Sequence, residues 1–255
     1  MKFDKYFPSS VALQTHVKYF VISEMDTEAE YKVLPTSGLV IGFQYKGRLT
    51  TVEGTNKNLL NTAGITGISD GYKIFQSSAN TGTVLIYFSE TGFRHFASHP
   101  AHELLNLSLP LDFIFDKNKV AEVEEKLSNA ITDTERLQIV ERFLISQLKD
   151  IETDKLIVEA VKLIYQSSGT IRVKELNQKL NISQSPFEKR FRRVVGTSPK
   201  KFSSIVRFNT VTSALGNARS LTELCYDNGF FDQSHFIKDF RKFTGVSPEE
   251  FRNSL

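Results

Sequence analysis

The 255-residue sequence predicts an α+β protein of two domains: a first domain in which a β-barrel is followed by a pair of helices, and an all-α second domain. Two observations predict this division. Up to about residue 110, short runs of β-branched and aromatic residues alternate with glycines, whereas beyond that point the apolar residues follow helical spacing. Within the second domain, moreover, one arrangement of residues occurs twice, which predicts two copies of the same helix pair.

The β-rich stretch contains five runs with strand character, at residues 17–23, 39–45, 47–53, 74–77 and 83–88. Short strands separated by glycine turns are typical of a small barrel or sandwich. Aromatic residues around the mouth of such a barrel would form a ligand pocket. The predicted pocket residues are Phe43, Tyr45, Tyr87, Phe93 and Phe96. The competing interpretation is that these side chains simply fill the interior, because many small barrels are packed solid.

Three of the five histidines, His95, His99 and His102, recur at helical spacing within eight residues. On one continuous helix they would share a face and could bind zinc. Pro100 interrupts that helix, because proline removes one backbone hydrogen bond and clashes with the preceding turn. The sequence therefore predicts neither a metal site nor a cofactor.

Between residues 116 and 148 the apolar residues form two helical stripes, separated by a turn at residues 128–133 in which Thr132 or Asp133 would cap the second helix. The polar segment KDIETD, residues 149–154, follows as a short junction without glycine or serine, and Asp154 would cap the next helix. We therefore expect an effector-sensing and dimerisation domain at residues 1–148 and a second domain at residues 154–255. The stripes are explained equally well by packing on the barrel and by a dimer interface.

The repeated unit is clearest in residues 219–252. Leu221, Leu224 and Cys225 form one apolar face, and a second helix follows a break at Gly229, which can take a positive φ angle. Asp232 would cap that second helix, whose buried face repeats phenylalanine at positions 236, 240 and 243. The pattern predicts a helix-turn-helix.

The same unit occurs upstream in residues 171–199, with a turn at Asn181. Phe187 precedes Phe236 by 49 residues, and the GTSP segment at 196–199 precedes the GVSP segment at 245–248 by the same 49 residues. Between the units, residues 199–215 predict one helix of 17 residues, a rod of about 25 Å. Such a rod would hold the two units near one turn of B-DNA apart, about 34 Å.

This block resembles the double helix-turn-helix DNA-binding domain of the AraC/XylS family of bacterial transcriptional regulators. The residues that carry the resemblance are Asn228-Gly229-Phe230, Asp232-Gln233-Ser234-His235-Phe236, Phe240-Arg241-Lys242, Thr244-Gly245-Val246-Ser247-Pro248 and Phe251-Arg252. The resemblance implies a sequence-specific DNA-binding regulator that is not an enzyme, with a cupin-like effector domain in front. Its implied partners are double-stranded promoter DNA, a small-molecule effector, a second copy as homodimer and, for an activator, RNA polymerase. Asn177 departs from the family pattern, and Pro186 limits base contact by the first unit.

The family pattern also implies which side chains meet DNA. The base-contacting residues would be Gln184, Ser185, Glu188, Lys189, Gln233, Ser234, His235 and Lys238. The phosphate-contacting residues would be Arg190, Arg192, Arg193, Lys200, Lys201, Arg207, Arg241 and Lys242. Charge supports this assignment, because residues 151–255 carry a net +6 and residues 1–150 a net −3.

The sequence has no apolar run that would span a membrane and no signal peptide at its start, so a cytoplasmic protein is expected. The single cysteine, Cys225, is expected to be buried and inert. Three other functions compete: a metal-dependent enzyme that uses the three histidines, a repair protein with a nucleophilic Cys225, and a protein-interaction module without sequence-specific DNA binding.

Overall fold

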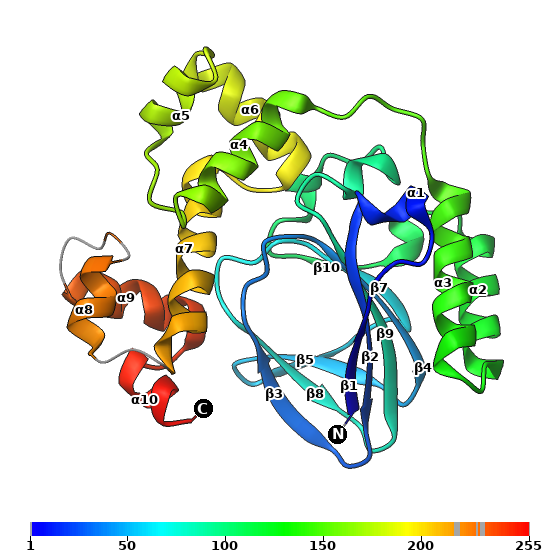
Figure 1. Ribbon diagram of the computed structural model, residues 1–255. Coiled ribbons are helices and arrows are strands. Elements are labelled where there is room, and N and C mark those ends of the chain that lie inside the picture. The colour runs from blue at the N-terminus through cyan, green and yellow to red at the C-terminus, as the bar shows by residue number, and fades with distance from the viewer. Residues whose placement is uncertain (1, 217–219, 228, 230–232, 255) are drawn as a thin grey trace.

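The computed structural model describes residues 2–216, 220–227, 229 and 233–254, without the side chains of residues 222, 223, 227 and 235. Two antiparallel sheets lie in the middle of the molecule, with helices α2 and α3 on one side and α4 to α10 on the other (Figure 1). This confirms the predicted α+β class with a sheet-rich first part and a helical second part. The strands form two separate sheets, however, and not one closed barrel.

The larger sheet has the strand order β1-β2-β9-β4-β7-β10, and the smaller sheet has the order β3-β8-β5-β6. The strands are β1 (Lys2–Tyr6), β2 (Val17–Met25), β3 (Ala29–Val33), β4 (Val40–Lys46), β5 (Leu49–Glu53), β6 (Asn56–Leu59), β7 (Ala63–Thr66), β8 (Lys73–Ser77), β9 (Thr81–Phe88) and β10 (Ser108–Pro110). All five predicted strands are present. The chain passes repeatedly from one sheet to the other, so sequence neighbours such as β4 and β5 lie in different sheets.

Gly47 makes one of these crossings possible, between β4 and β5. Its φ angle is +66°, and a Cβ atom there would lie 2.6 Å from the Cα atom of Thr81. Only glycine combines that backbone conformation with so close an approach.

Three short 3-10 helices follow β9: η1 (Phe93–His95) and η2 (Ala101–Leu104) lie before β10, and η3 (Leu111–Phe113) lies after it. Pro100 separates η1 from η2, as its effect on helices predicts. Phe93 and Phe96 are 1% and 2% exposed and pack against Phe88 with ring centroids 5.7 and 5.2 Å apart. These aromatic residues therefore belong to the hydrophobic core.

The predicted helix pair consists of α2 (Lys117–Asn129) and α3 (Asp133–Gln147). Of the two residues predicted to cap the second helix, Thr132 does so: it caps α3 in a capping box with Glu135. The apolar stripes of both helices pack on the larger sheet, where Phe143 meets Phe43 and Phe115 edge to face. Packing on the sheet thus accounts for the stripes. A short helix, α1 (Val11–Gln14), lies near α3.

The helical part contains α4 (Lys155–Gln166), α5 (Val173–Lys179), α6 (Gln184–Val195), α7 (Pro199–Leu215), α8 (Leu221–Asp227), α9 (Gln233–Thr244) and α10 (Pro248–Asn253). The predicted rod of residues 199–215 is α7. Asp154 accepts a hydrogen bond from the backbone NH of Ile157 at 3.1 Å and so caps α4, as predicted. A hydrophobic core separate from that of the sheets holds these helices together.

The sequence repeat is also a structural repeat. Helices α6 and α9 have 12 residues each and begin 49 residues apart, as do α7 and α10. Phe187 and Phe191 meet at 5.7 Å and 65°, and Phe236 and Phe240 at 5.7 Å and 63°. Each second phenylalanine then contacts a ring of the helix that follows, Phe202 or Phe251. The 49-residue offset therefore preserves packing as well as sequence.

Candidate nucleic-acid interface and ligand cavity

In the first unit, α5 and α6 are joined by a turn at Asn181, whose φ angle is +48°, as predicted. Gln184, Ser185 and Lys189 are exposed on α6, while Phe187 on the opposite face is fully buried. Glu188 is half-buried and accepts a hydrogen bond from Gln184 at 2.9 Å. The exposed start of α6 thus presents hydrogen-bonding side chains to solvent.

The second unit has the same arrangement. Gln233, Ser234 and Lys238 are exposed on α9, and Phe236 is buried beneath them. Gly229, in the turn before α9, has a φ angle of +66°, as its predicted role requires. The predicted cap Asp232 and the side chain of His235 lie outside the described part of the structure.

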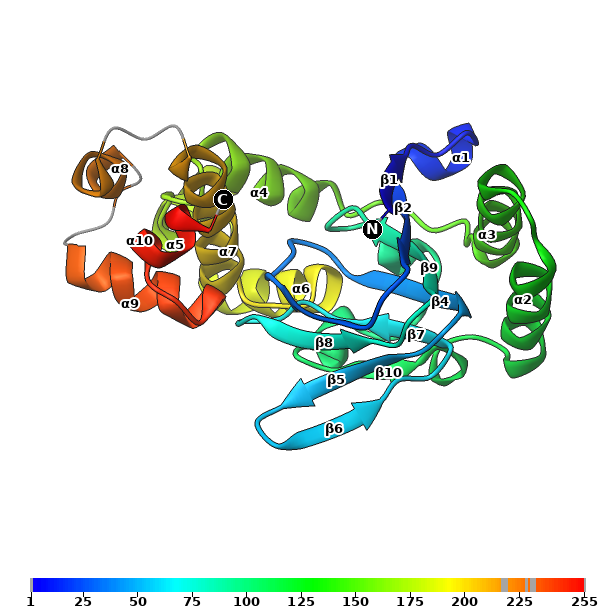
Figure 2. The same cartoon turned by 90° about the horizontal axis from the view of Figure 1, so that it is seen from below.

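Helices α6 and α9 lie on the same side of the helical part, with α7 between them (Figure 2). Aromatic contacts hold both to α7: Phe202 meets Phe191 at 5.6 Å, and Phe208 meets Phe240 at 5.4 Å. Because α7 has 17 residues, the rod is about 25 Å long. The polar side chains at the starts of α6 and α9 are exposed to solvent.

The eight predicted phosphate contacts differ in their surroundings. Arg192, Arg193, Lys200 and Arg241 are exposed. Arg207 is half-buried, and burial lowers its pKa. Its contact with DNA phosphates stays a prediction.

Arg192 pairs with Glu188 of the same helix at 3.6 Å, and the remaining three predicted phosphate contacts form ion pairs with acidic residues of other segments. Arg190 pairs with Asp154 at 2.5 Å. Lys201 pairs with Asp70 at 2.5 Å, and Lys242 lies 4.0 Å from the same carboxylate. Lys201 lowers the pKa of Asp70 by its hydrogen bond and its charge. We call the cluster of Asp70, Lys201 and Lys242 the Asp70 contact.

The Asp70 contact belongs to a larger junction between the sheets and the helices. Ile68, in the loop between β7 and β8, is 1% exposed and lies in the helical core. Lys32 donates a hydrogen bond to the backbone oxygen of Thr244 at 3.3 Å. Glu90, 8% exposed, pairs with Lys18 at 2.5 Å and accepts a hydrogen bond from the Tyr165 hydroxyl of α4. Sequence patterns did not reveal these contacts, because each joins residues far apart in the chain.

A cavity of about 1170 Å³ lies between the two sheets. Of the five predicted pocket residues, only Tyr87 lines it. On β4, the alternating positions Val40, Gly42 and Gln44 face the cavity, so Phe43 and Tyr45 point to the opposite face of the sheet.

The other four predicted pocket residues do not line this cavity. Phe43, Phe93 and Phe96 are core residues. The Tyr45 hydroxyl instead donates a hydrogen bond to Glu24 at 2.6 Å, and its ring lies against Arg136 of α3. Tyr87 is buried enough to raise the pKa of its hydroxyl to about 12.

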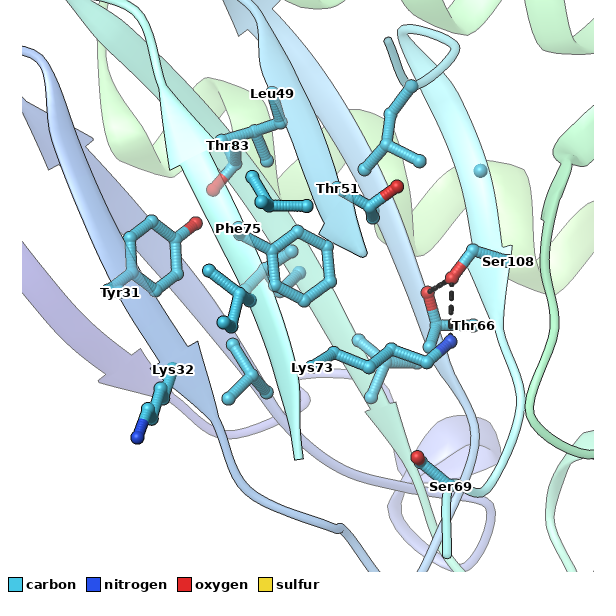
Figure 3. Close-up of a pocket in the computed structure, with 18 of the residues that line it drawn as sticks. Tyr31, Lys32, Leu49, Thr51, Thr66, Ser69, Lys73, Phe75, Thr83 and Ser108 are labelled. Carbon is cyan, nitrogen blue, oxygen red and sulfur yellow. Dashed lines mark hydrogen bonds between the residues drawn. The ribbon is translucent and has the colours of Figure 1, made fainter. Parts of the chain in front are cut away.

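Figure 3 shows the interior of this cavity, where Lys73 reaches toward two hydroxyl groups. The Lys73 ammonium donates a hydrogen bond to Ser108 Oγ at 3.0 Å, and Ser108 Oγ lies 3.1 Å from Thr66 Oγ1. Burial lowers the pKa of Lys73. Tyr31 and Phe75 line the same cavity with apolar surface and stack on each other at 6.0 Å.

The three histidines at 95, 99 and 102 do not converge. In the described part of the chain no group of three residues is arranged to hold a metal ion. His95 is buried and stacks on His16 with ring centroids 4.0 Å apart, whereas His102 is exposed. Cys225 is buried at 2% exposure, as expected for an inert thiol.

Because of His95, we expect the free energy of unfolding to fall as the pH is lowered, at pH values where most carboxylates are still ionised. Burial, aided by nearby His16 and Arg94, lowers the pKa of His95 to about 4. The unfolded chain, with a histidine pKa of about 6.5, binds more protons, so stability decreases as pH falls through this window. Urea unfolding between about pH 7 and about pH 5 measures the slope. His95→Gln should flatten it and His102→Gln should not; equal slopes for wild type and His95→Gln would contradict the assignment.

Two family models match the sequence. A model described as a helix-turn-helix domain matches residues 176–254, the region that carries both exposed helix starts and the resemblance to the AraC/XylS family. Residues 176–254 therefore form an AraC-type helix-turn-helix domain. A second model, described as a domain of unknown function (DUF6597), matches residues 5–110 of the same chain.

No curated protein matches the sequence. Among solved structures, the chain is similar to ToxT from Vibrio cholerae, with 15% identity over 92% of this chain and 98% of that chain and a TM-score of 0.49. It is also similar to unsaturated-fatty-acid-bound ToxT from Vibrio cholerae strain SCE256 (13% identity, 92% and 95% coverage, TM-score 0.47) and to the AraC-like transcriptional activator CuxR (14% identity, 83% and 86% coverage, TM-score 0.32). Similarity at this distance transfers no ligand or partner. None of the described helices has the length and apolar character needed to cross a lipid bilayer.

Proposed function

We propose that this protein is an AraC-type transcription regulator, that it reads two adjacent major-groove segments of promoter DNA with α6 and α9, and that residues 1–148 modulate the binding of residues 154–255. The observation that carries the proposal is that α6 and α9, which lie on the same side of the helical part with α7 between them (Figure 2), both begin with exposed polar side chains. A protruding helix with polar residues early and basic residues late suits base edges and then phosphates. In this proposal the cytoplasm, where the DNA lies, is the place of action.

Gln233 and Lys238 provide the test of base reading. Gln233→Ala and Lys238→Ala should each weaken binding to a selected site by about 1–3 kcal/mol and relax sequence preference, because glutamine pairs with adenine and lysine with guanine. Arg193→Ala, at an exposed basic residue of α6, should weaken all DNA sequences about equally. Fluorescence anisotropy on selected and scrambled duplexes at several salt concentrations measures both effects. Equal losses on every sequence for all three variants would contradict the proposal.

The modulation is proposed to act through the Asp70 contact. Asp70 holds Lys201 and Lys242, two residues proposed to contact phosphates, so the first part of the chain competes with DNA for them. The loop that bears Asp70 also borders the cavity, through Gly67, Ser69 and Tyr72. A ligand in the cavity can therefore move the loop and change the availability of the two lysines.

Selection of bound fragments from genomic DNA, with and without small molecules, tests the whole proposal. Enrichment of one sequence with two half-sites about 10 base pairs apart would support it, and no enrichment over random DNA would overturn it. The proposed homodimer is tested by sedimentation equilibrium with and without that DNA. The proposed contact with RNA polymerase applies to an activator and is tested by transcription from the selected promoter.

A further inference from the structure

The cavity between the sheets has walls of mixed chemistry. Much of its lining is apolar, from both sheets, and includes Met25, Leu49, Val52, Ile65, Phe75 and Leu85. Charged side chains also border it: Glu30 and Glu53 are exposed, whereas Lys32 is directed to Thr244 of the helical part. Lys73 is the charged residue that extends into the space drawn in Figure 3 beside Ser108 and Thr66.

The positive charge of Lys73, whose ammonium group is half-buried, is poorly balanced by its surroundings. The hydrogen-bond partner seen for it is the neutral hydroxyl of Ser108, and within the described residues no carboxylate lies at ion-pair distance from it. Its pKa is lowered by burial, and the negative charge of Glu53 offsets this only in part. A desolvated cation without an anion is costly, so an anionic partner entering the cavity would bind there favourably.

The hydroxyl groups near Lys73 complete a binding site for an acid group. Ser108 Oγ lies 3.0 Å from the ammonium and 3.1 Å from Thr66 Oγ1, so ammonium and hydroxyl donors converge on one region of the cavity wall. A carboxylate accepts several hydrogen bonds at once and would use both kinds of donor. The apolar surface of Tyr31 and Phe75 lies on the same side of the cavity, where the body of a ligand would rest.

We propose that the cavity binds an amphipathic molecule with a single acid group, which Lys73 holds while the apolar walls hold its body. This inference rests on the proposed function of the first part of the chain as an effector domain, and it names the chemical class of the effector. Lys73 begins β8, and the segment directly before it, residues 69–72, carries Asp70. An acid group bound to Lys73 would thus lie three residues along the chain from Asp70.

Calorimetry on the full-length protein without DNA tests the ligand class. The probes are decanoate and 1-decanol, which share an apolar chain and differ in the acid group. Lys73→Met should weaken decanoate binding about tenfold or more and leave decanol affinity unchanged within about twofold. Lys73→Arg should restore most of the decanoate affinity, because arginine keeps the positive charge. Lys117→Met, at an exposed lysine of α2, is the matched control and should change neither affinity.

Two results would overturn the inference: decanoate binding Lys73→Met as tightly as wild type, or no binding of decanoate to the wild type. DNA binding by the same variants, measured without either probe, tests the proposed function separately from the proposed ligand class. Normal DNA binding by Lys73→Met shows that the variant is folded and that a loss of decanoate affinity is local. Failure of the wild type to bind any preferred DNA would overturn the proposed function and leave the calorimetric result intact.

Discussion

Phe240→Ala is expected to lower the free energy of unfolding of the helical part by about 3–5 kcal/mol and to abolish sequence-specific DNA binding. Phe240 is 1% exposed and lies at the centre of the second helix-turn-helix. Its ring meets Phe236 at 5.7 Å, Phe208 of α7 at 5.4 Å and Phe251 of α10 at 5.5 Å. Alanine would leave a cavity among three helices, and α9 would lose the contacts that fix it to the rod.

Urea unfolding followed by far-ultraviolet circular dichroism measures the loss, and anisotropy with a selected duplex measures binding. Phe113→Ala is the matched control, because Phe113 is 60% exposed and lies in η3 of the first part. It should change the unfolding free energy by less than about 0.5 kcal/mol. An unfolding free energy for Phe240→Ala within about 1 kcal/mol of wild type would mean that this core is not packed as described.

The helical part was largely predictable from the sequence because its information is local and duplicated. The spacing of Phe187 and Phe191, repeated 49 residues later, fixes which face of each helix is buried. Capping residues and glycines then mark the ends: α7 covers residues 199–215 as predicted, and Gly196 and Gly245 end their helices with positive φ angles. The apolar spacing, the capping residues and the glycines all indicate the same helices, so the sequence predicts these helices well.

The sheets were less predictable because strand pairing is not local. The five runs richest in β-branched and aromatic residues were predicted, but β1, β3, β6, β7 and β10 were missed. Strands β6 and β10 have four and three residues, too few for a clear alternation of apolar and polar side chains. The sequence also did not show that the strands divide between two sheets, since that depends on which strands pair.

The uncertainty about the strands also affected the prediction of the pocket residues. Successive residues of a strand face opposite sides, so the prediction had to choose between Gln44 and its neighbours Phe43 and Tyr45. It chose by aromatic character, and the structure places Gln44 on the cavity side. Lys73 was not predicted, because only the assembled sheets show that its ammonium enters a cavity beside Ser108.

Asp70→Lys is expected to increase affinity for DNA of any sequence by about tenfold or more at low salt, with a steeper dependence on salt concentration. The substitution removes the carboxylate that pairs with Lys201 at 2.5 Å and lies 4.0 Å from Lys242, and it puts a third cation beside them. Each phosphate neutralised steepens the salt dependence by about one unit of slope. Asp70→Asn, which frees the two lysines without adding charge, should give a smaller increase in the same direction.

Anisotropy with a random duplex at several salt concentrations distinguishes release of the two lysines from a general effect of net charge. Glu125→Lys makes the same charge change on α2, which lies across the sheets from α9 in both overall views (Figures 1 and 2). Exposed charges farther apart than a Debye length, about 10 Å at 0.1 M salt, are screened, so the control should raise affinity little at that ionic strength. Equal gains for Asp70→Lys and Glu125→Lys would mean that the Asp70 contact does not restrain DNA binding. A gain confined to Asp70→Lys that shrinks as salt rises would place Lys201 and Lys242 on the phosphate backbone.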